Sequence, residues 1–545
     1  MSTKKHKIPL FRFKKVTFIG TVPDIKVTVN LHGWSTQTCY GHVRRGCPPT
    51  RWKLDTSIFW NICGIIQGEV TKWNQDSMFQ PSVESLTVVT TSLCCLRNTF
   101  PHCSRNQLLV AESVDLVDPI ISCTQWTFRT ADRDNKRVVL TEEDSHQNPL
   151  TTTENNNDCH KEVVETPEQD VLSDRNSHSE WKKAHSTLAS ACVTCLGNMV
   201  AANSLTRKLI WPHLLPVLRD LLGYPDWQVS QMASMILHNC LLEEGLRKEL
   251  CRNNQVKVIV NKLLSLYVNE SQYSCFVLFC LELLLCSKDI VEVSWSHLSG
   301  EQQLLCLDVL AAILTDTSQK RCEPLSTSTI TFLVHFFKSE ADKILCTHAG
   351  QLQQDGSQVL VRLANFVCTA AASDAWRYLL QQDSSLIITS LYLLRCMTDI
   401  GKMGGNAFTP LNQLSDLTDE EQMATAETHP AFGFKCDLIR LIASLVYRHK
   451  DNQDQVREMN GILLLLESSQ FDARNPLIKE VSIFAVRNLL EGNLENQLFV
   501  KGLKLKSVAE NPGLQELGLE AVCEGEQIRL VQRSGSSPDY DDTEL

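Results

Sequence analysis

Two cysteines three positions apart have the spacing of half a structural zinc site. Cys192 and Cys195 form this pair, and His185 lies close to them in the sequence. A structural zinc ion takes four protein ligands, and no second pair of cysteines with this spacing occurs in the chain. Because Leu188 and Leu196 share an apolar helical face with the pair, we predict buried structural thiols and no metal site.

Two further groups match chemical sites in composition only. Cys94 and Cys95, followed by His102 and Cys103, stand at the end of an apolar helical segment. Residues 401–405 are rich in glycine, but they lack the spacing of a phosphate-binding loop and no strand precedes them. The sequence also contains none of the motifs of serine hydrolases, zinc proteases or protein kinases. We therefore predict no catalytic residues, no cofactor and a protein that is not an enzyme.

Asparagine recurs instead, at the ends of apolar helical segments. Two of these asparagines lie 41 residues apart, and Ser444 lies 44 residues before another. A period in this range is typical of stacked armadillo or HEAT repeats, each of two or three helices. The fold class predicted is all-α, an armadillo/HEAT-like right-handed α-solenoid with a disordered acidic insertion. The recurring positions are Asn98, Asn198, Asn239, Asn365 and Asn488.

These asparagines have two interpretations. In armadillo repeats the position falls on the third helix, whose exposed side lines a groove and can hydrogen-bond the backbone of an extended peptide. Asparagine also commonly caps or solvates the end of its own helix. Both interpretations stay open for Asn488, and the capping role is favoured at the other positions.

The C-terminal repeats carry a series of further amides. An apolar segment at 438–446 precedes a polar stretch, and a second apolar segment at 483–490 precedes another. Stacking brings equivalent positions of successive repeats to one side, which predicts an exposed ridge of amides suited to a protein partner, unless these residues serve turns and caps. The candidate partner-binding residues are Asn452, Gln453, Gln455, Asn488, Asn493, Asn496 and Gln497.

The apolar pattern also sets the expected domain boundaries. Residues 130–180 contain thirteen acidic and five basic residues and little apolar periodicity, so they cannot bury enough surface to offset their ordering entropy. The expected order is a poorly defined N-terminal segment at 1–80 with strand-like alternation at 16–29, first armadillo-like helices at 82–128, the disordered insertion at 130–180, armadillo-like repeats at 181–400, a loop at 401–429, a C-terminal repeat domain at 430–508 and a mostly disordered tail at 509–545.

The composition of the chain argues against binding to nucleic acid and against a membrane span. The chain has 52 Lys and Arg against 63 Asp and Glu, a net charge of -11, which is no footprint for nucleic acid. Its longest apolar run, 275–286, is interrupted by Glu282 and is shorter than the roughly 20 residues that a membrane span needs. Most of the 22 cysteines lie in apolar helical runs, and the basic N-terminus lacks the features of a secretory signal. We expect a cytosolic chain with reduced cysteines.

The amino-acid sequence of residues 436–497 is characteristic of one protein family. The segments CDLIRLIASLVYRHKDNQDQVREMNGILLLLESSQFDARNPLIKE and FAVRNLLEGNLENQ closely resemble the C-terminal conserved domain of the ataxin-10 family. Val481 and Ser482 depart from the family, which tends to have a Trp-Ala-like pair there, and this is a difference in packing. The resemblance makes residues 430–508 an ataxin-10-like domain.

This resemblance implies a cytoplasmic, perinuclear scaffold that acts in cytokinesis, neurite outgrowth, neuronal survival and intracellular signalling. It adds the midbody and the centrosome or basal body as further locations. The partners it implies are the O-linked N-acetylglucosamine transferase, a G-protein β subunit and mitotic kinases, and it leaves a homo-oligomer open. The alternative is a regulatory subunit of an enzyme such as that transferase system, or a cryptic enzyme, because catalytic partners can be remote in sequence.

Overall fold

The computed structural model describes most of the chain after residue 55. The described residues are 56–75, 79–101, 103–145, 168–269, 275–315, 324–345, 356–412, 427, 429, 431–503, 514–515, 518–524 and 527–532. The segment 16–29, for which alternation predicts a strand, lies outside them.

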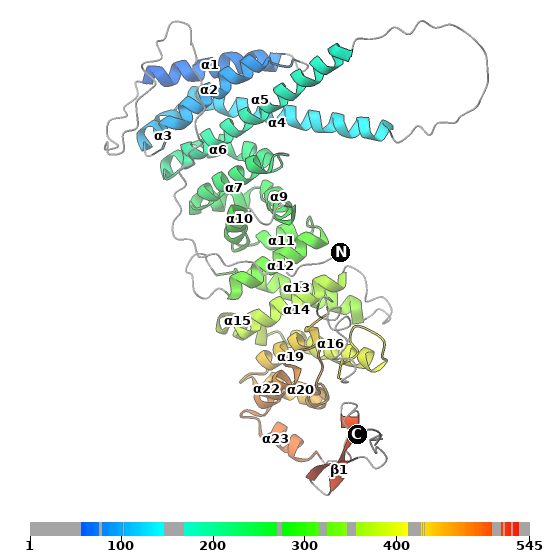
Figure 1. Cartoon of the computed structure of the whole chain (residues 1–545). Coiled ribbons are helices and arrows are strands. Elements are labelled where there is room, and N and C mark those ends of the chain that lie inside the picture. Colours follow the sequence, from blue (N-terminus) through cyan, green and yellow to red (C-terminus); the bar gives the residue numbers. More distant parts are fainter. Residues whose placement is uncertain are drawn as a thin grey trace, which may run out of the picture. The chain divides into compact units, whose positions relative to one another are not determined.

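The described residues are almost entirely helical (Figure 1). The helices are α1 (Thr56–Gln75), α2 (Val83–Thr99), α3 (Ser104–Ala111), α4 (Val114–Ser145), α5 (Glu168–Val200), α6 (Ser204–Leu221), α7 (Trp227–Leu241), α8 (Glu244–Arg252), α9 (Gln255–Asn269), α10 (Cys275–Leu285), α11 (Ile290–Trp295), α12 (Gly300–Thr315), α13 (Thr327–Leu345), α14 (Gly356–Ala372), α15 (Asp374–Gln381), α16 (Ser384–Lys402), α19 (Phe434–Leu445), α20 (Lys450–Glu458), α21 (Gly461–Glu467), α22 (Ile478–Leu490) and α23 (Leu494–Lys501). Two strands, β1 (Leu519–Glu524) and β2 (Gln527–Gln532), follow.

One helix of each repeat packs on its counterpart in the next repeat, and we call these the row helices. The contacts run from α2 to α5, α7, α10, α12, α14, α19 and α22 in turn. A second series, α1, α4, α6 and α9, and then α11, α13 and α16, packs in the same sequential way. Such nearest-neighbour packing is that of an α-solenoid. The predicted all-α solenoid is therefore confirmed, and its handedness stays a prediction.

The row helices are apolar on more than one face because they are covered from two sides. In α19, which contacts both α14 and α22, Leu438, Ile439, Leu441 and Ile442 are all fully buried. A helix that is hydrophobic all round is stable only in such surroundings. The repeat stack therefore has a continuous core along the row.

Capping side chains fix where several helices begin. Asp226 precedes α7 and accepts a hydrogen bond from the amide of Gln228, and Asp383 precedes α16 and accepts from those of Ser385 and Leu386. These carboxylates satisfy amide groups that have no partner in the first turn of a helix. The short polar segments between helices thereby define sharp repeat boundaries.

The N-terminal repeats are more ordered than the sequence pattern predicts. Helix α1 lies within the segment 1–80 that has no clear expectation, and α4 and α5 extend into 130–180 from either side. At their junction Thr130 Oγ1 lies 2.7 Å from His185 Nε2, and Trp181 Nε1 donates to the carbonyl of Pro81 at 2.9 Å. Residues 146–167 of the expected insertion lie outside the described residues.

The segment after the last helix contains a hairpin. Strands β1 and β2 pair antiparallel, with Leu519 opposite Gln532 and Glu524 opposite Gln527. The sequence pattern predicts a mostly disordered tail at 509–545, and this part of it is ordered instead. Within the described residues, none of the helices has the length and hydrophobicity to cross a membrane.

The loop expected at 401–429 is anchored where it is described. The carbonyl of Leu411 accepts a hydrogen bond from the amide of Ala473 at 3.0 Å, and the Leu411 amide donates to Asp472 at 3.1 Å. Gly401, at the end of α16, permits a close approach, because a Cβ there would lie 2.5 Å from the carbonyl oxygen of Phe408. This glycine therefore has a packing role at the end of α16.

Candidate functional site

The thiols with zinc-like spacing lie inside the helical core. Cys192 and Cys195 are buried in α5, and the sulfur of Cys192 lies 3.7 Å from that of Cys123 in α4. Burial raises the pKa of the Cys195 thiol well above its ordinary value. Among the residues that the structure describes, no group of three or more His, Cys, Asp and Glu side chains is arranged to hold a metal ion.

Most of the amides expected on an exposed ridge are buried. Gln455 is half-buried on α20, and Gln497 on α23 is exposed. The expectation of exposure is wrong for Asn452, Gln453, Asn488, Asn493 and Asn496, each at most 2% exposed. The reason is that their amides pair with backbone groups of neighbouring helices, which removes them from solvent.

The buried amides follow a repeated local pattern. An Asn-Gln pair occupies the third and fourth positions of three short helices: Asn106-Gln107 in α3, Asn452-Gln453 in α20 and Asn496-Gln497 in α23. In each case the asparagine donates to the carbonyl seven residues earlier, at the end of the preceding row helix. These acceptors are Thr99, Leu445 and Leu489, at 2.9 to 3.0 Å. The pair therefore ties the short helix back to its own repeat.

In two of the three pairs the glutamine reaches forward to the next repeat. Gln453 Nε2 donates to the carbonyls of Asn488 and Glu491, at 2.9 and 3.2 Å, where α22 ends. Gln107 Nε2 makes the equivalent contacts at the end of α5, with the carbonyls of Asn198 and Ala201 at 2.8 and 2.9 Å. The last carbonyls of a helix have no partner within it, so these donors satisfy groups that burial would otherwise leave unpaired. We call this arrangement the amide latch.

A third latch uses a glutamine outside any Asn-Gln pair. Gln381, the last residue of α15, donates to the carbonyls of Ser444 and Tyr447 at the end of α19, at 3.3 and 2.8 Å. Gln107 and Gln381 are absent from the candidate partner-binding residues that the sequence predicts. The repeated Asn-Gln pair could have identified Gln107, but nothing in the local sequence distinguishes Gln381.

Three of the recurring asparagines on the row helices bind a neighbouring repeat. Asn488 donates to the carbonyl of Ala443 in α19 at 2.9 Å, and Asn198 donates to that of Arg97 in α2 at 3.2 Å. Asn365 donates to the carboxylate of Asp437 at 2.9 Å. Asn98 accepts from the adjacent Arg97, and Asn239 is half-buried in α7. The expectation that Asn488 lines the side of a groove is wrong, because its amide is used between repeats.

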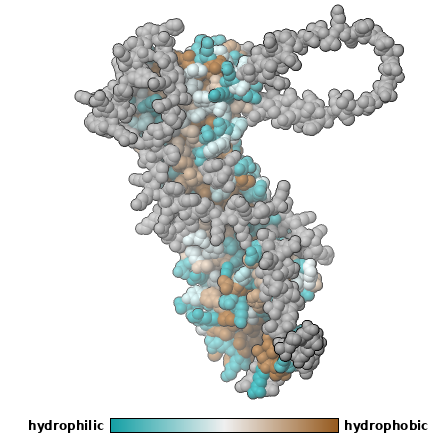
Figure 2. Space-filling view, viewed as in Figure 1, coloured by the Kyte–Doolittle hydropathy of each residue, from teal (hydrophilic) through white to brown (hydrophobic). Residues whose placement is uncertain are grey.

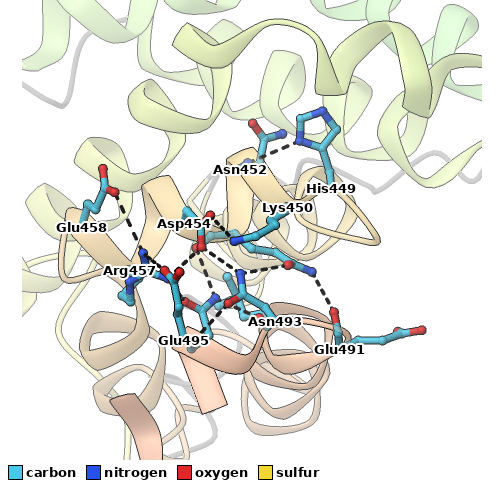
Figure 3. Close-up of polar contacts among 12 residues, drawn as sticks. His449, Lys450, Asn452, Asp454, Arg457, Glu458, Glu491, Asn493 and Glu495 are labelled. Atoms are coloured by element: carbon cyan, nitrogen blue, oxygen red, sulfur yellow. Dashed lines mark hydrogen bonds and ion pairs between the residues drawn. The ribbon is translucent and has the colours of Figure 1, made fainter. Parts of the chain in front are cut away.

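Charged side chains surround the C-terminal latch (Figure 3). Asp454 accepts hydrogen bonds from Lys450, Arg457 and Asn493, all between 2.7 and 2.9 Å. Burial alone would raise the pKa of Asp454, but these hydrogen bonds outweigh it and lower the pKa to about 2. Arg457 also contacts Glu495 on α23 at 2.9 Å. The cluster joins α20 to α23, and its charged groups pair with one another.

Large apolar side chains are exposed in the last repeat. They lie in or next to α22 and α23, and Figure 2 shows hydrophobic surface mixed with hydrophilic surface toward this end of the stack. Contiguous exposed apolar surface is one mark of a protein-protein contact. The residues are Leu477, Ile483, Phe484, Leu494 and Leu498, with exposed fractions of 48% to 67%.

Comparison with known proteins supports the resemblance found in the sequence. A family model described as "Spinocerebellar ataxia type 10 protein domain" matches residues 434–531, which comprise α19 to α23 and most of the hairpin. Ataxin-10 of Macaca fascicularis is 30% identical over 345 residues, which cover 62% of this chain and 69% of the relative. Human ataxin-10 is 29% identical over 345 residues, which again cover 62% of this chain and 69% of the relative.

Another relative is more similar over a shorter stretch. The ataxin-10 homolog of Dictyostelium discoideum is 51% identical over 88 residues, which cover 16% of this chain and 14% of the relative. The similarity to the primate proteins extends well beyond the domain model. This chain belongs to the ataxin-10 family.

Proposed function

We propose that the chain is a non-catalytic scaffold of the ataxin-10 type that binds other proteins through the surfaces of its helical repeats. The observation that carries the proposal is the group of exposed apolar side chains in the last repeat, beside polar side chains that are already paired within the chain. A solenoid offers extended surface for binding without needing a pocket for chemistry.

The proposed cellular role is based on family membership. We propose that the chain acts in cytokinesis, in neurite outgrowth and neuronal survival, and in intracellular signalling, in the cytoplasm and around the nucleus. The partners proposed are the O-linked N-acetylglucosamine transferase, a G-protein β subunit and mitotic kinases. Self-association of the chain is a further proposal of the same kind.

The seven amides take different parts in this proposal. Gln455 and Gln497 remain candidates for direct partner contact, because their side chains are not fully buried. Asn452, Gln453, Asn488, Asn493 and Asn496 contribute indirectly, by fixing the positions of α20, α22 and α23.

The test is binding of the full chain to each purified partner. Sedimentation velocity of the mixture should show a species heavier than either component for at least one of the three. Bovine serum albumin, which has no relation to the proposal, serves as the control. Separate sedimentation of the chain and every partner would contradict the scaffold role toward these proteins.

The alternative is a regulatory subunit of the transferase system, or an enzyme with an unrecognised site. We prefer the scaffold because the polar series that the sequence offers as a site donates to the chain's own carbonyls. The transferase reaction on a peptide substrate separates the two, since a scaffold leaves kcat and KM for a short peptide unchanged. A change in either constant when the full chain is added would support the alternative.

A further inference from the structure

The last repeat has the same internal register as the repeat before it. Asn452-Gln453 and Asn496-Gln497 are 44 residues apart, so every position of α19 has a counterpart 44 residues later in α22. The counterparts of Ile439, Ile442 and Val446 are Ile483, Val486 and Leu490. Equivalent positions of α19 and α22 can therefore be compared for burial.

Ile439 and Ile442 of α19, and Val446 directly after it, are fully buried, and their counterparts in α22 are not. Ile439 is 0% exposed and Ile483 is 57% exposed, while Val486 and Leu490 are partly exposed. Ile483, Val486 and Leu490 have the i, i+3, i+7 spacing of a single helix face. Helix α19 lies between α14 and α22, whereas α22 packs on α19 and no later row helix occurs in the described part of the chain.

Gln497, the latch donor of the last repeat, makes only some of the hydrogen bonds that Gln453 makes. Gln453 Nε2 donates within its own repeat to the carbonyl of Val446, and forward to Asn488 and Glu491. Gln497 Nε2 makes the equivalent first contact, with the carbonyl of Leu490 at 2.7 Å. Its side chain is exposed, and its amide makes no forward contact to another described residue. The donor is positioned for the end of a helix that the described chain does not supply.

We propose that the end face formed by Ile483, Val486, Leu490 and Gln497 binds an amphipathic α-helix of another protein, in the manner of one more row helix. The apolar side of that helix packs on α22, and its C-terminal carbonyls accept from Gln497. The orientation follows from the donor, because an amide N–H pairs with the carbonyl end of a helix and not with its amide end. This inference rests on the proposed scaffold function and names the class of partner for one of its surfaces.

The interfaces inside the stack indicate which kind of element the end face binds. Helix α22 sits on α19 with its end held by Gln453, α19 ends against Gln381, and α5 ends against Gln107. A surface that repeats the apolar positions and the donor of these junctions has the chemistry to receive the same kind of element. Helix-in-groove recognition by apolar anchors at this spacing is a common mode of protein binding.

The probe for the experiment is a fluorescein-labelled peptide with the sequence of residues 478–491 and an amidated C-terminus. This peptide has the sequence of a row helix and keeps the carbonyls that a latch holds. Its binding to the full chain is followed by fluorescence anisotropy. A peptide with Pro in place of Val486 cannot form the helix and is the control for the probe.

Two variants of the full chain test the end face. Ile483→Ser should weaken binding about tenfold or more, because it removes a central apolar contact. Gln497→Leu should weaken it about two- to tenfold, the size of one hydrogen bond. Leu205→Ser is the matched control, since Leu205 is 59% exposed on the distant α6 and should leave binding unchanged. Equal affinity of the wild type and both end-face variants, or no binding at all, would overturn the proposal.

A photochemical variant identifies the occupant. With p-benzoylphenylalanine at position 483, illumination in the presence of the peptide should give a cross-link between chain and peptide. A cross-link to a second copy, or to the chain's own residues with exclusion of the peptide, assigns the face to that occupant and overturns the proposal. If a purified partner binds the Ile483→Ser chain as well as the wild type, the scaffold stands and only the end-face inference fails.

Discussion

At the scale of single residues, the amide side chains determine how one repeat is fixed to the next. Gln453 is 2% exposed and donates to three carbonyls in two helices. Its removal leaves acceptors buried without donors, which costs more than the hydrogen bonds contribute in net terms. Gln497, on the exposed end face, leaves no such acceptors behind.

Gln453→Leu should lower the free energy of unfolding by about 2 kcal/mol, because buried carbonyls at the end of α22 lose their donor. Gln497→Leu is the matched control and should change it by less than about 0.5 kcal/mol. Urea denaturation followed by circular dichroism measures both. Equal effects of the two substitutions would show that the latch contributes nothing specific.

The charge cluster around Asp454 gives a pH-dependent contribution. The pKa of this carboxyl is lowered from its ordinary value of 3.8 to about 2 in the folded chain, so its stabilising effect is complete above pH 3.8 and is lost as the pH falls toward 2. Asp454→Asn should therefore lower the unfolding midpoint at pH 6, and the gap to the wild type should narrow between pH 4 and pH 2. A gap that stays constant over this range would contradict the assignment.

At the scale of elements, apolar periodicity predicts where helices run but not where they stop. The segment 130–180 reads as disordered because it is acidic and lacks an apolar face, yet α4 reaches Ser145 and α5 begins at Glu168. Contacts far apart in sequence, such as that of Trp181 with Pro81, help to hold the N-terminal half of α5 in place. A local pattern cannot report such contacts. The hairpin β1–β2 escaped prediction for a related reason, since two six-residue strands give little signal.

Trp181→Ala tests the packing of the N-terminal half of α5. Trp181 is 7% exposed and stacks on His185 with 5.0 Å between ring centres, so the substitution should cost about 3 kcal/mol of stability. Trp60→Ala is the control, because Trp60 is 49% exposed on α1 and its loss should cost less than about 0.5 kcal/mol. Thermal unfolding of both variants is the measurement, and an unaffected Trp181→Ala protein would show that this end of α5 is not integral.

At the scale of the whole molecule, a stack of repeats transmits disturbance only to its neighbours. Gln453→Leu should raise the rate of amide hydrogen exchange in α20 and α22 and leave α2 and α5 unchanged. Gln107→Leu should do the reverse: exchange should become faster in α3 and α5 and stay unchanged in α22. Exchange measured by mass spectrometry on the full chain checks both, and a uniform increase over the chain would indicate a single cooperative unit instead.

The fold could be predicted from the sequence, whereas the role of the amide side chains could not. A 44-residue period and apolar helices suffice for an all-α solenoid, because periodicity is a local property that repeats. Whether Asn488 lines a groove or binds Ala443 depends on which side of the row helix the neighbouring repeat covers. That depends on packing between residues 45 positions apart. The short stretches rich in Asn and Gln were therefore found correctly, but their direction, inward to the stack, was not.

The latch also affects how such a chain can change its length in evolution. The segment 449–492 carries the donor Gln453 on α20 and offers its acceptors at the end of α22, so a copy of this segment inserted in frame after residue 492 would meet both requirements at the new junction. Lengthening by duplication then needs no compensating substitution inside the stack. The number of repeats is thus a property that a single genetic event can alter, while the terminal surface that faces a partner is inherited unchanged.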